Sequence, residues 1–259
     1  MICALSGALR RRHPLIYMIK KDGVLKFDKF MKFPDLIHGF STRVFGDMRP
    51  SHESSTESLG KFSKALGVPM GRIVRMRQVH GNAVRWIRGK DGGNKIEETD
   101  GLLSSDPDVF LSVVTADCIP ILLYDPVRQV VSAVHAGWRG VYKEIVEQAI
   151  DEMVKNGSDP KDIIAGMGPS VRVCCYDVGE EHAKMFTTKF PKWSSVVKRE
   201  GKFFLDLPLL AKCQLRSLGI PDTNIEDGGI CTNDSPADLF SCRREGKEFG
   251  EFVGVIGRL

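Results

Sequence analysis

The sequence predicts an α/β (or α+β) protein, in which a single domain holds mixed β-sheets covered by helices. Three apolar runs in the middle of the chain lead to this prediction, at residues 110–115, 119–124 and 130–135. Unbroken runs of this kind are typical of strands that are buried on both faces. Strand and helix patterns then follow in mixed order, which fits a mixed sheet better than a doubly wound parallel sheet.

Two polar segments precede these strands, at residues 46–57 and 89–100, and both are predicted to be surface loops. A helix is predicted after the third strand, because apolar residues recur at intervals of four from Val141 to Met153. The pair Asn156-Gly157 provides its C-terminal stop.

The remaining elements follow from the same signals. Asp206 can cap a helix that ends near Gly219. The other predicted elements are a strand at 163–167, a helix at 179–190, and strands at 224–230 and 252–256.

The chain has 259 residues, enough for one substantial core. Residues 1–21 carry five basic residues before the first acidic one, Asp22, and are interpreted as an N-terminal extension that can be disordered. Residues 22–259 then form the domain. The net charge of +4 is scattered without a basic stripe, so nucleic acid is not a predicted partner. The apolar runs fall short of the ~20 residues that a membrane span needs.

Seven cysteines occur, an odd number without the spacing of a small disulfide-rich domain. This pattern favours a reducing compartment and predicts a cytoplasmic protein.

Three residues stand out as candidate metal ligands: His80, Cys118 and His135. Each lies in or at the end of an apolar run and is closely followed by glycine or proline, where rigid strands give way to turns. Two imidazoles and a thiolate suit zinc, and three protein ligands leave a fourth position open for chemistry. Each of these residues alone is equally compatible with an ordinary core position.

Neighbouring residues add polar groups to this candidate site. Asp117 precedes Cys118 and can orient a ligand or cap a turn. Arg139 lies where a helix begins after His135, which suits either an anion such as phosphate or a surface salt bridge.

Two further segments offer similar chemistry. Ser41 and Arg43 supply a hydroxyl and a guanidinium after a glycine turn. Cys175 can approach a metal or substrate, although a buried free thiol is the common case. Residues 241–244 offer further anion contacts or solvated charge.

Several motifs occur together in one order. They are Gln78-Val79-His80-Gly81, Thr115-Ala116-Asp117-Cys118-x-Pro120, His135-Ala136-Gly137-Trp138-Arg139-Gly140, Gly168-Pro169-Ser170 with Cys175-Tyr176-x-Val178-Gly179, and Cys231-Thr232 followed by Ser241-x-Arg243-Arg244. From about His38 onward, the chain resembles the family first labelled as laccase-domain or multicopper polyphenol oxidases. That family is now described as zinc-containing purine nucleoside phosphorylases with adenosine deaminase activity.

The resemblance implies that His80, Cys118 and His135 bind zinc rather than copper, within a single α/β domain with mixed sheets. It implies phosphorolysis of adenosine, inosine, guanosine and methylthioadenosine, and deamination of adenosine. The implied partners are purine nucleosides and phosphate, with the oligomeric state left open. Residues 44–47 and 171–173 and Glu251 depart from the family pattern, which affects substrate range and phosphate affinity most.

On this hypothesis, zinc lowers the pKa of a bound water toward ~7 for attack on adenine. Cys118, Asp117 and Arg43 are the predicted catalytic residues, with Asp117 relaying protons. The predicted substrate and phosphate contacts are Ser41, Arg43, Arg139 and Cys175.

Three alternatives remain. Cys118 and His135 can form the nucleophile and base of a hydrolase acting on cell-wall precursors. A copper polyphenol oxidase would need many more histidines than the six present. A structural zinc site would normally have four protein ligands.

Overall fold

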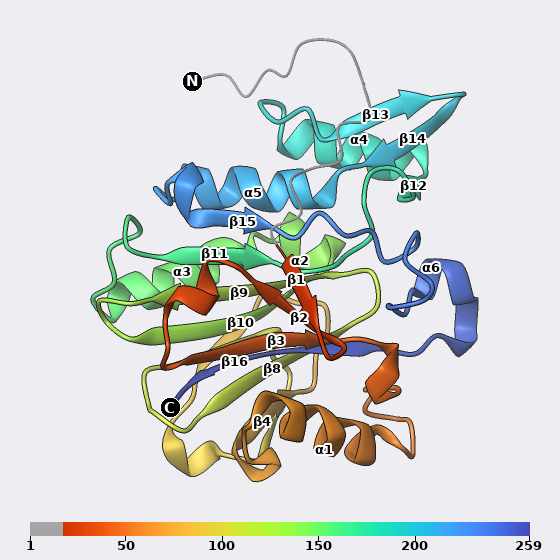
Figure 1. The fold of residues 1–259 in the computed structure, drawn as a ribbon. Coiled ribbons are helices and arrows are strands. Elements are labelled where there is room, and N and C mark those ends of the chain that lie inside the picture. Colours follow the sequence, from red (N-terminus) through yellow and green to blue (C-terminus); the bar gives the residue numbers. More distant parts are fainter. Residues whose placement is uncertain (1–17) are drawn as a thin grey trace.

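Two large β-sheets pack face to face and place the central apolar strands inside the protein. The computed structural model describes residues 18–259. Figure 1 shows the layers, with helix α1 below the seven-stranded sheet and helix α5 above the strands of the six-stranded sheet.

The first sheet has seven strands, and the C-terminal strand lies in the middle of it. Its order is β1 (Met18–Lys21), β2 (Val24–Phe27), β3 (Leu36–Ser41), β16 (Phe252–Arg258), β8 (Phe110–Thr115), β4 (Ile73–Met76) and β6 (Lys95–Ile96). Strand β16 pairs antiparallel with both β3 and β8, whereas β4 pairs parallel with β8 and β6. The sheet is therefore mixed, as predicted.

The second sheet has six strands. Its order is β15 (Ile225–Asp227), β11 (Ile164–Met167), β9 (Ile119–Asp125), β10 (Val130–Ala136), β7 (Gly101–Ser104) and β5 (Val84–Trp86). Strands β9 and β10 pair antiparallel in a register that sets Pro120 opposite His135. This register brings the start of β9 and the end of β10 side by side at one end of these two strands.

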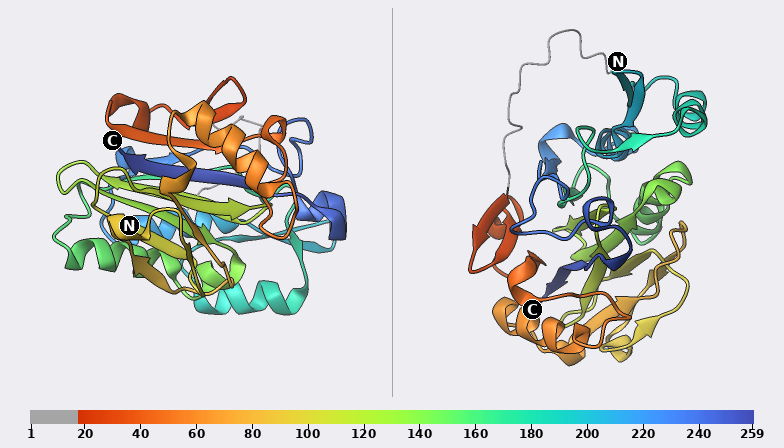
Figure 2. Two further views of the ribbon diagram at one scale, coloured as in Figure 1. Left: turned by 90° about the horizontal axis from the view of Figure 1, so that it is seen from below. Right: turned by 90° about the vertical axis from the view of Figure 1, so that its right-hand side faces the viewer.

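A small third sheet and the helices complete the described chain. The small sheet has the order β12 (Asp177–Val178), β14 (Lys202–Leu205) and β13 (Val196–Arg199). The helices are α1 (Ser55–Leu66), α2 (Trp138–Tyr142), α3 (Ile145–Lys155), α4 (Glu180–Lys189), α5 (Leu207–Ser217) and α6 (Cys242–Glu245). The 3-10 turns are η1 (Phe30–Lys32), η2 (Arg43–Phe45), η3 (Met70–Arg72), η4 (Gly89–Asp91), η5 (Asp222–Asn224) and η6 (Gly246–Glu248). In the right-hand view of Figure 2, α4 and the small sheet lie at the top.

Three apolar cores fill the spaces between these layers. The core between the two large sheets contains Leu122 and Val131, whereas their neighbours Leu123 and Val130 face the core under α3 and α5. A third core joins α1 to the seven-stranded sheet. Strands β9 and β10 are buried along their whole length because apolar layers cover both of their faces.

The predicted strands of the central region and the helices α4 and α5 are confirmed. Asp206 caps α5 as predicted, since its carboxylate accepts a hydrogen bond from the Leu209 amide at 3.0 Å. The strand predicted at 224–230 is shorter, because Gly228 and Gly229 follow β15 and Gly229 has a φ of 69°.

Other predictions need correction. The single helix predicted after His135 is broken into α2 and α3, because Glu144 adopts a left-handed conformation with φ 59°. The loop predicted at 46–57 ends in the first turn of α1, and the loop at 89–100 contains η4 and β6. The domain begins before residue 22, because Met18–Lys21 pairs with β2. Residues 1–17 lie outside the described residues.

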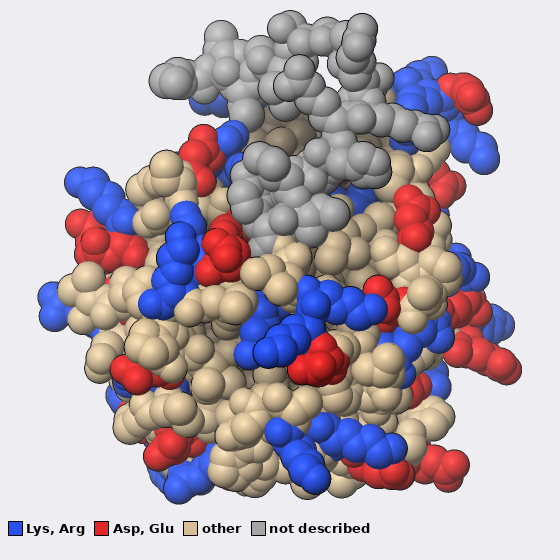
Figure 3. All heavy atoms as spheres, viewed as in Figure 1, with Lys and Arg blue, Asp and Glu red and all other residues tan. Residues whose placement is uncertain are grey.

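Two general properties follow from residues 18–259. None of their helices is long and apolar enough to cross a membrane. Acidic and basic side chains are interspersed on the face shown in Figure 3.

Candidate metal centre and active site

His80, Cys118 and His135 converge at one edge of the two-sheet core. His80 lies in the turn between β4 and β5, Cys118 immediately precedes β9, and His135 is near the end of β10. Their potential ligand atoms all lie within 4.8 Å of one another. The two imidazole rings are 4.7 Å apart between centroids and nearly perpendicular. These three side chains can therefore hold one metal ion.

A buried carboxylate, Asp100, joins the two histidines. Its Oδ1 lies 2.8 Å from Nδ1 of His135 and accepts a hydrogen bond from the His80 amide at 2.9 Å. Its Oδ2 accepts from the amides of Val79 and Gly81. Histidine ligands commonly donate their second ring nitrogen to such a carboxylate, which fixes the tautomer and the ring orientation.

The local backbone at the site is constrained. His80 has φ 56° and Asp117 has φ 92°, both in a region that non-glycine residues seldom adopt. The His80 turn is held to β8 by Gln78, whose side chain donates to the Val114 carbonyl at 2.7 Å and accepts from its amide at 2.8 Å. Strained conformations persist where surrounding contacts over-determine them, as here.

Electrostatics favour a thiolate at Cys118. Burial would raise the pKa of this thiol, but His135 and His80 overcome that effect and lower the pKa to about 6. Burial opposes the charged form of His135, yet Cys118 and Asp100 raise its pKa. The thiolate is the form that binds metals and acts as a nucleophile.

Gly137 leaves the space that the three side chains require. A Cβ atom at this position would lie 3.0 Å from Sγ of Cys118 and 3.1 Å from Cδ2 of His80. The φ of Gly137 is −71°, so the restriction comes from space rather than from backbone conformation. The donor set and this cradle fit a single metal ion with thiolate and imidazole ligands.

A cavity of about 560 Å³ opens beside the three residues. Its wall includes Asp117, Tyr176, Arg243 and Glu251 together with His80, Cys118 and His135. Burial raises the pKa of the Glu251 carboxyl to about 7. The cavity thus combines a candidate metal centre, a cation and a carboxyl group that holds its proton near neutral pH.

Asp117 lies at the cavity wall with both oxygens engaged. Its Oδ1 accepts a hydrogen bond from the Thr232 hydroxyl at 2.5 Å, and its Oδ2 accepts from the Arg243 amide at 2.7 Å. The side chain of Arg243 donates to Asp177 and lies over the Tyr176 ring. Asp117 therefore connects the Cys118 segment to the start of α6.

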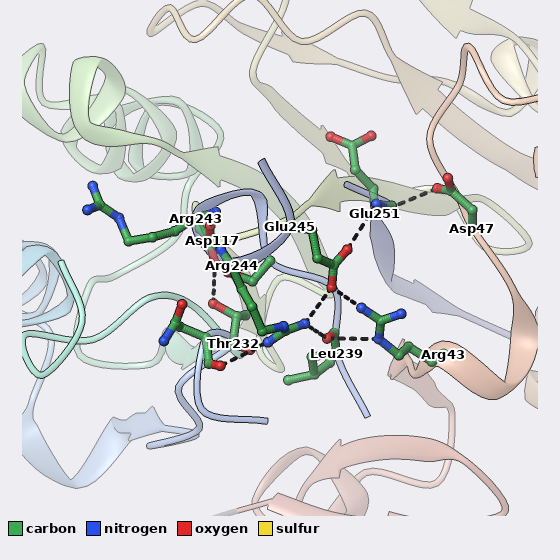
Figure 4. A network of polar contacts seen from close by, with 12 residues as sticks. Arg43, Asp47, Asp117, Thr232, Leu239, Arg243, Arg244, Glu245 and Glu251 are labelled. Carbon is green, nitrogen blue, oxygen red and sulfur yellow. Dashed lines mark hydrogen bonds and ion pairs between the residues drawn. The ribbon is translucent and has the colours of Figure 1, made fainter. Parts of the chain in front are cut away.

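The structure places Ser41 and Arg43 away from the cavity wall. Ser41 is buried and accepts a hydrogen bond from the Val253 amide. Arg43 is paired with Glu245, donates to the Leu239 carbonyl and stacks over Phe240. Figure 4 shows this network, in which the Arg43 guanidinium points toward Glu245.

Arg139 also lies outside the cavity wall. Its guanidinium stacks on the neighbouring Trp138 ring, 4.2 Å from the centroid. Among residues 18–259, the lysine and arginine side chains that line the cavity are Arg77, Lys95 and Arg243.

Cys175 belongs to a different cluster. Its Sγ lies 3.1 Å from Asp234, which also contacts the Cys174 thiol, and Cys174 in turn lies near Cys231. Sequence reasoning did not identify this cluster, because residues 174–175 and 231–234 are far apart in the chain. All six cysteines among the described residues are free thiols.

Asp100 was the main functional residue missed. The available signal was an acidic residue directly before the apolar run that forms β7, Gly101–Ser104. Its partner His135 lies 35 residues away, so only the fold brings the two together.

Comparisons with known proteins agree with this arrangement. The sequence profile described as "Multi-copper polyphenol oxidoreductase laccase" matches residues 45–259. A protein named purine nucleoside phosphorylase from Deinococcus radiodurans is 33% identical over 233 residues, covering 85% of this chain and 88% of the relative. A purine nucleoside phosphorylase of Streptomyces coelicolor is 35% identical over 194 residues, covering 75% and 78%.

The crystal structure of YlmD from Geobacillus stearothermophilus superimposes with a TM-score of 0.87 at 25% identity, covering 95% of this chain and 99% of that protein. The profile match spans most of the chain, and two relatives exceed 30% identity over at least three quarters of it. The chain therefore belongs to the family described as multi-copper polyphenol oxidoreductase laccase, whose relatives include proteins named purine nucleoside phosphorylase.

Proposed function

We propose that this protein is a purine nucleoside phosphorylase that converts a nucleoside and phosphate into a free base and ribose 1-phosphate. The observation that carries the proposal is the cluster of His80, Cys118 and His135 in the wall of a cavity of about 560 Å³. Cavities of this volume are typical of small-molecule sites. The names of its relatives in Deinococcus and Streptomyces support this choice of substrate class.

The proposed cofactor is zinc, held by His80, Cys118 and His135. Two imidazoles and one thiolate suit zinc, and three protein ligands are typical of a catalytic rather than a structural site. When bound, zinc would supply Lewis acidity for the deamination of adenosine. Asp100 orients His135 and supports the His80 turn. Free cysteines suit a reducing compartment, so we place the protein in the cytoplasm.

Arg243 is the proposed phosphate contact. It lies in the cavity wall, and Asp117 fixes its backbone amide. A guanidinium can bind phosphate through two parallel hydrogen bonds. Arg43 and Arg139, which the sequence suggested for this role, lie outside the cavity wall, where they contact Glu245 and Trp138, whereas Arg243 lines the cavity although it also pairs with Asp177. Arg43 and Arg139 can still affect activity through the segments that they hold.

Glu251 is the proposed acid. Phosphorolysis breaks the bond between C1′ and the base, and the departing base leaves more easily when a neighbouring group protonates it. Burial keeps a proton on the Glu251 carboxyl up to a pH of about 7. Both oxygens of Asp117 accept hydrogen bonds, so we assign Asp117 a positioning role toward Arg243 and Thr232.

One observation favours a second candidate. Cys118, His135 and Asp100 are arranged in space like a nucleophile, a base and the carboxylate that orients the base. The pKa of the Cys118 thiol is also lowered. A cysteine hydrolase would be inactivated by alkylation and would retain activity after chelation. The zinc phosphorylase would lose its activity on chelation and recover it when zinc is returned.

Product analysis tests the proposed function. Metal-analysed protein is incubated with adenosine, with and without phosphate, and the products are separated. Ribose 1-phosphate in an amount equal to adenine plus any hypoxanthine, formed only with phosphate, supports phosphorolysis, and inosine supports the proposed deamination. Inosine, guanosine and methylthioadenosine then define the substrate range. If zinc-loaded protein forms neither of these products, the proposal is wrong.

A further inference from the structure

A second group of metal-ligating side chains lies beside the candidate active site. It consists of Cys174, Cys175, Cys231 and Asp234, whose ligand atoms all lie within 4.8 Å of one another. We propose that these four residues bind a second zinc ion, which holds together two loops of the cavity wall. This site goes beyond the proposed function and does not depend on it.

Three distances within the cluster are close to those of a tetrahedral zinc shell. Zinc–sulfur and zinc–oxygen bonds place two sulfur ligands about 3.8 Å apart and a sulfur and an oxygen about 3.5 Å apart. Here Sγ of Cys174 lies 3.6 Å from Sγ of Cys231 and 3.3 Å from Asp234. Sγ of Cys175 lies 3.1 Å from the other oxygen of Asp234.

The backbone explains why two adjacent cysteines face one point. Adjacent residues of a strand point to opposite faces, but residues 173–175 form a turn. The amides of Cys175 and Tyr176 both donate to the Arg172 carbonyl. This turn directs both thiols toward Asp234.

Neighbouring contacts hold the two loops in place. Ser170 and Cys231 form a parallel bridge, and Arg172 makes a bidentate ion pair with Asp227 at 2.7 and 2.6 Å. Arg199 donates to the Val173 carbonyl. These contacts hold both loops in register beside the cluster.

Four protein ligands define the class of the site. Zinc sites with four protein ligands are structural, whereas catalytic sites keep one position open. Each loop carries a residue of the candidate active site next to a cysteine of the cluster. Tyr176 lines the cavity, and Thr232 donates its hydroxyl hydrogen bond to Asp117. The second zinc would thus fix the wall that carries Tyr176 and Arg243.

Metal content of the full chain tests this proposal. We expect two zinc ions per wild-type chain, one in Cys118→Ser, one in Cys231→Ser and none in the double variant. Cys242→Ser is the matched control, since it removes a neighbouring thiol outside both clusters, and it should keep two. Zinc-free Cys118→Ser protein titrated with cobalt should develop thiolate-to-cobalt charge-transfer absorption, which the double variant lacks.

The cobalt titration keeps the test valid if Cys231→Ser fails to fold, because Cys118→Ser retains the whole cluster. The proposal would be overturned if folded Cys118→Ser protein binds no zinc and shows no thiolate-to-cobalt absorption. A disulfide between Cys174 and Cys231 that persists in protein purified with a thiol reductant and supplied with zinc would also overturn it. Either failure leaves the Cys118-dependent zinc and the phosphorolysis assay unaffected, so the two proposals fail separately.

Discussion

Asp100 links both histidines of the candidate metal centre to the protein interior. One carboxylate oxygen contacts His135 and the His80 amide, and the other accepts two amides of the same turn. Burial would raise the pKa of Asp100, but the hydrogen bonds of His135 and these amides lower it. Asp100 therefore stays ionised while it orients the histidines.

Replacing Asp100 by asparagine should weaken zinc binding. The amide nitrogen of asparagine cannot accept the hydrogen bonds that the carboxylate now accepts, and loss of such partners typically lowers metal affinity about 10–100-fold. Competition with a chromogenic chelator measures the change. Asp151→Asn, on the exposed side of α3, is the control and should bind zinc like the wild type. Unchanged affinity in Asp100→Asn would contradict this role.

Arg243 should matter for phosphate more than the arginines suggested by the sequence. A hydrogen bond to a charged group contributes about 1.5–3 kcal/mol, so Arg243→Ala should raise the KM for phosphate about 10–100-fold. Arg139→Ala should change this KM much less, because its guanidinium stacks on Trp138 outside the cavity. Steady-state kinetics at varied phosphate compares the two. The reverse ranking would contradict the assignment.

The metal-ligand candidates could be predicted from local sequence, whereas the partners of the arginines could not. The convergence of His80, Cys118 and His135 could be predicted because each lies in a local motif next to a turn. The environments of Arg43 and Arg139 depend on Glu245 and on a stacking geometry, which are set by packing. The sequence carries no local sign of either.

The turn from β10 to α2 is the element on which the site depends most. Gly137 caps α2 with an extended conformation, φ −71° and ψ 170°, and leaves room for Cys118 and His80. Gly179 caps α4 with a nearly identical conformation, φ −67° and ψ 158°, but has open space around its Cα. Comparing an alanine at each position therefore separates a clash with Cys118 and His80 from the general effect of adding a methyl group.

Gly137→Ala should weaken zinc binding, because its Cβ would lie 3.0 Å from Sγ of Cys118. Overpacking typically costs about 1–3 kcal/mol, which corresponds to a loss in affinity of about 5- to 150-fold. Gly179→Ala should leave affinity unchanged. Zinc titration of both variants measures this difference, and equal affinities would show that the space beside Gly137 is not needed.

Element predictions succeeded where local signals decide the conformation. Helix α5 begins at its Asp206 cap, and the apolar runs became β8, β9 and β10. The break between α2 and α3 depends on distant partners. Lys189 contacts the Glu144 carboxylate, and Asn82 donates to the Lys143 carbonyl. These partners stabilise a left-handed residue within an otherwise regular helical pattern.

The packing of whole sheets assembles the site from distant segments. Cys118 and His135 come from the six-stranded sheet, while the His80 turn is anchored to β8 of the seven-stranded sheet through Gln78. The mixed-sheet architecture could be predicted, because it follows from the apolar runs. The order of strands could not, since pairing of β16 with β3 and β8 joins segments more than 130 residues apart.

Stability should depend on pH through Glu251. Its pKa is raised by burial to about 7, compared with about 4.3 in an unfolded chain. Between these values the folded state binds more protons, so the free energy of unfolding falls as the pH rises. Glu251→Gln removes this dependence and should gain stability over the wild type from about pH 4.3 to pH 7. Urea unfolding at pH 5 and pH 8 measures the free energy of unfolding of both proteins. If the variant and the wild type differ by the same amount at both pH values, the pKa of Glu251 is not raised.

The same group should shape the pH profile of the reaction. If Glu251 donates a proton to the departing base, the wild-type kcat should fall as the pH rises above about 7. Glu251→Gln should be slower and should lack this fall. If Glu251→Gln keeps the wild-type dependence of kcat on pH, another group donates the proton to the departing base.

The central claim is that His80, Cys118 and His135 hold a zinc ion in a nucleoside-binding cavity. The most direct measurement follows phosphate-dependent formation of adenine and ribose 1-phosphate from adenosine by wild-type and Cys118→Ser protein of known zinc content. We expect product from the wild type, loss of product on chelation, recovery with zinc, and little product from Cys118→Ser. Full activity in Cys118→Ser, or no phosphate-dependent product from zinc-loaded wild type, would contradict the claim.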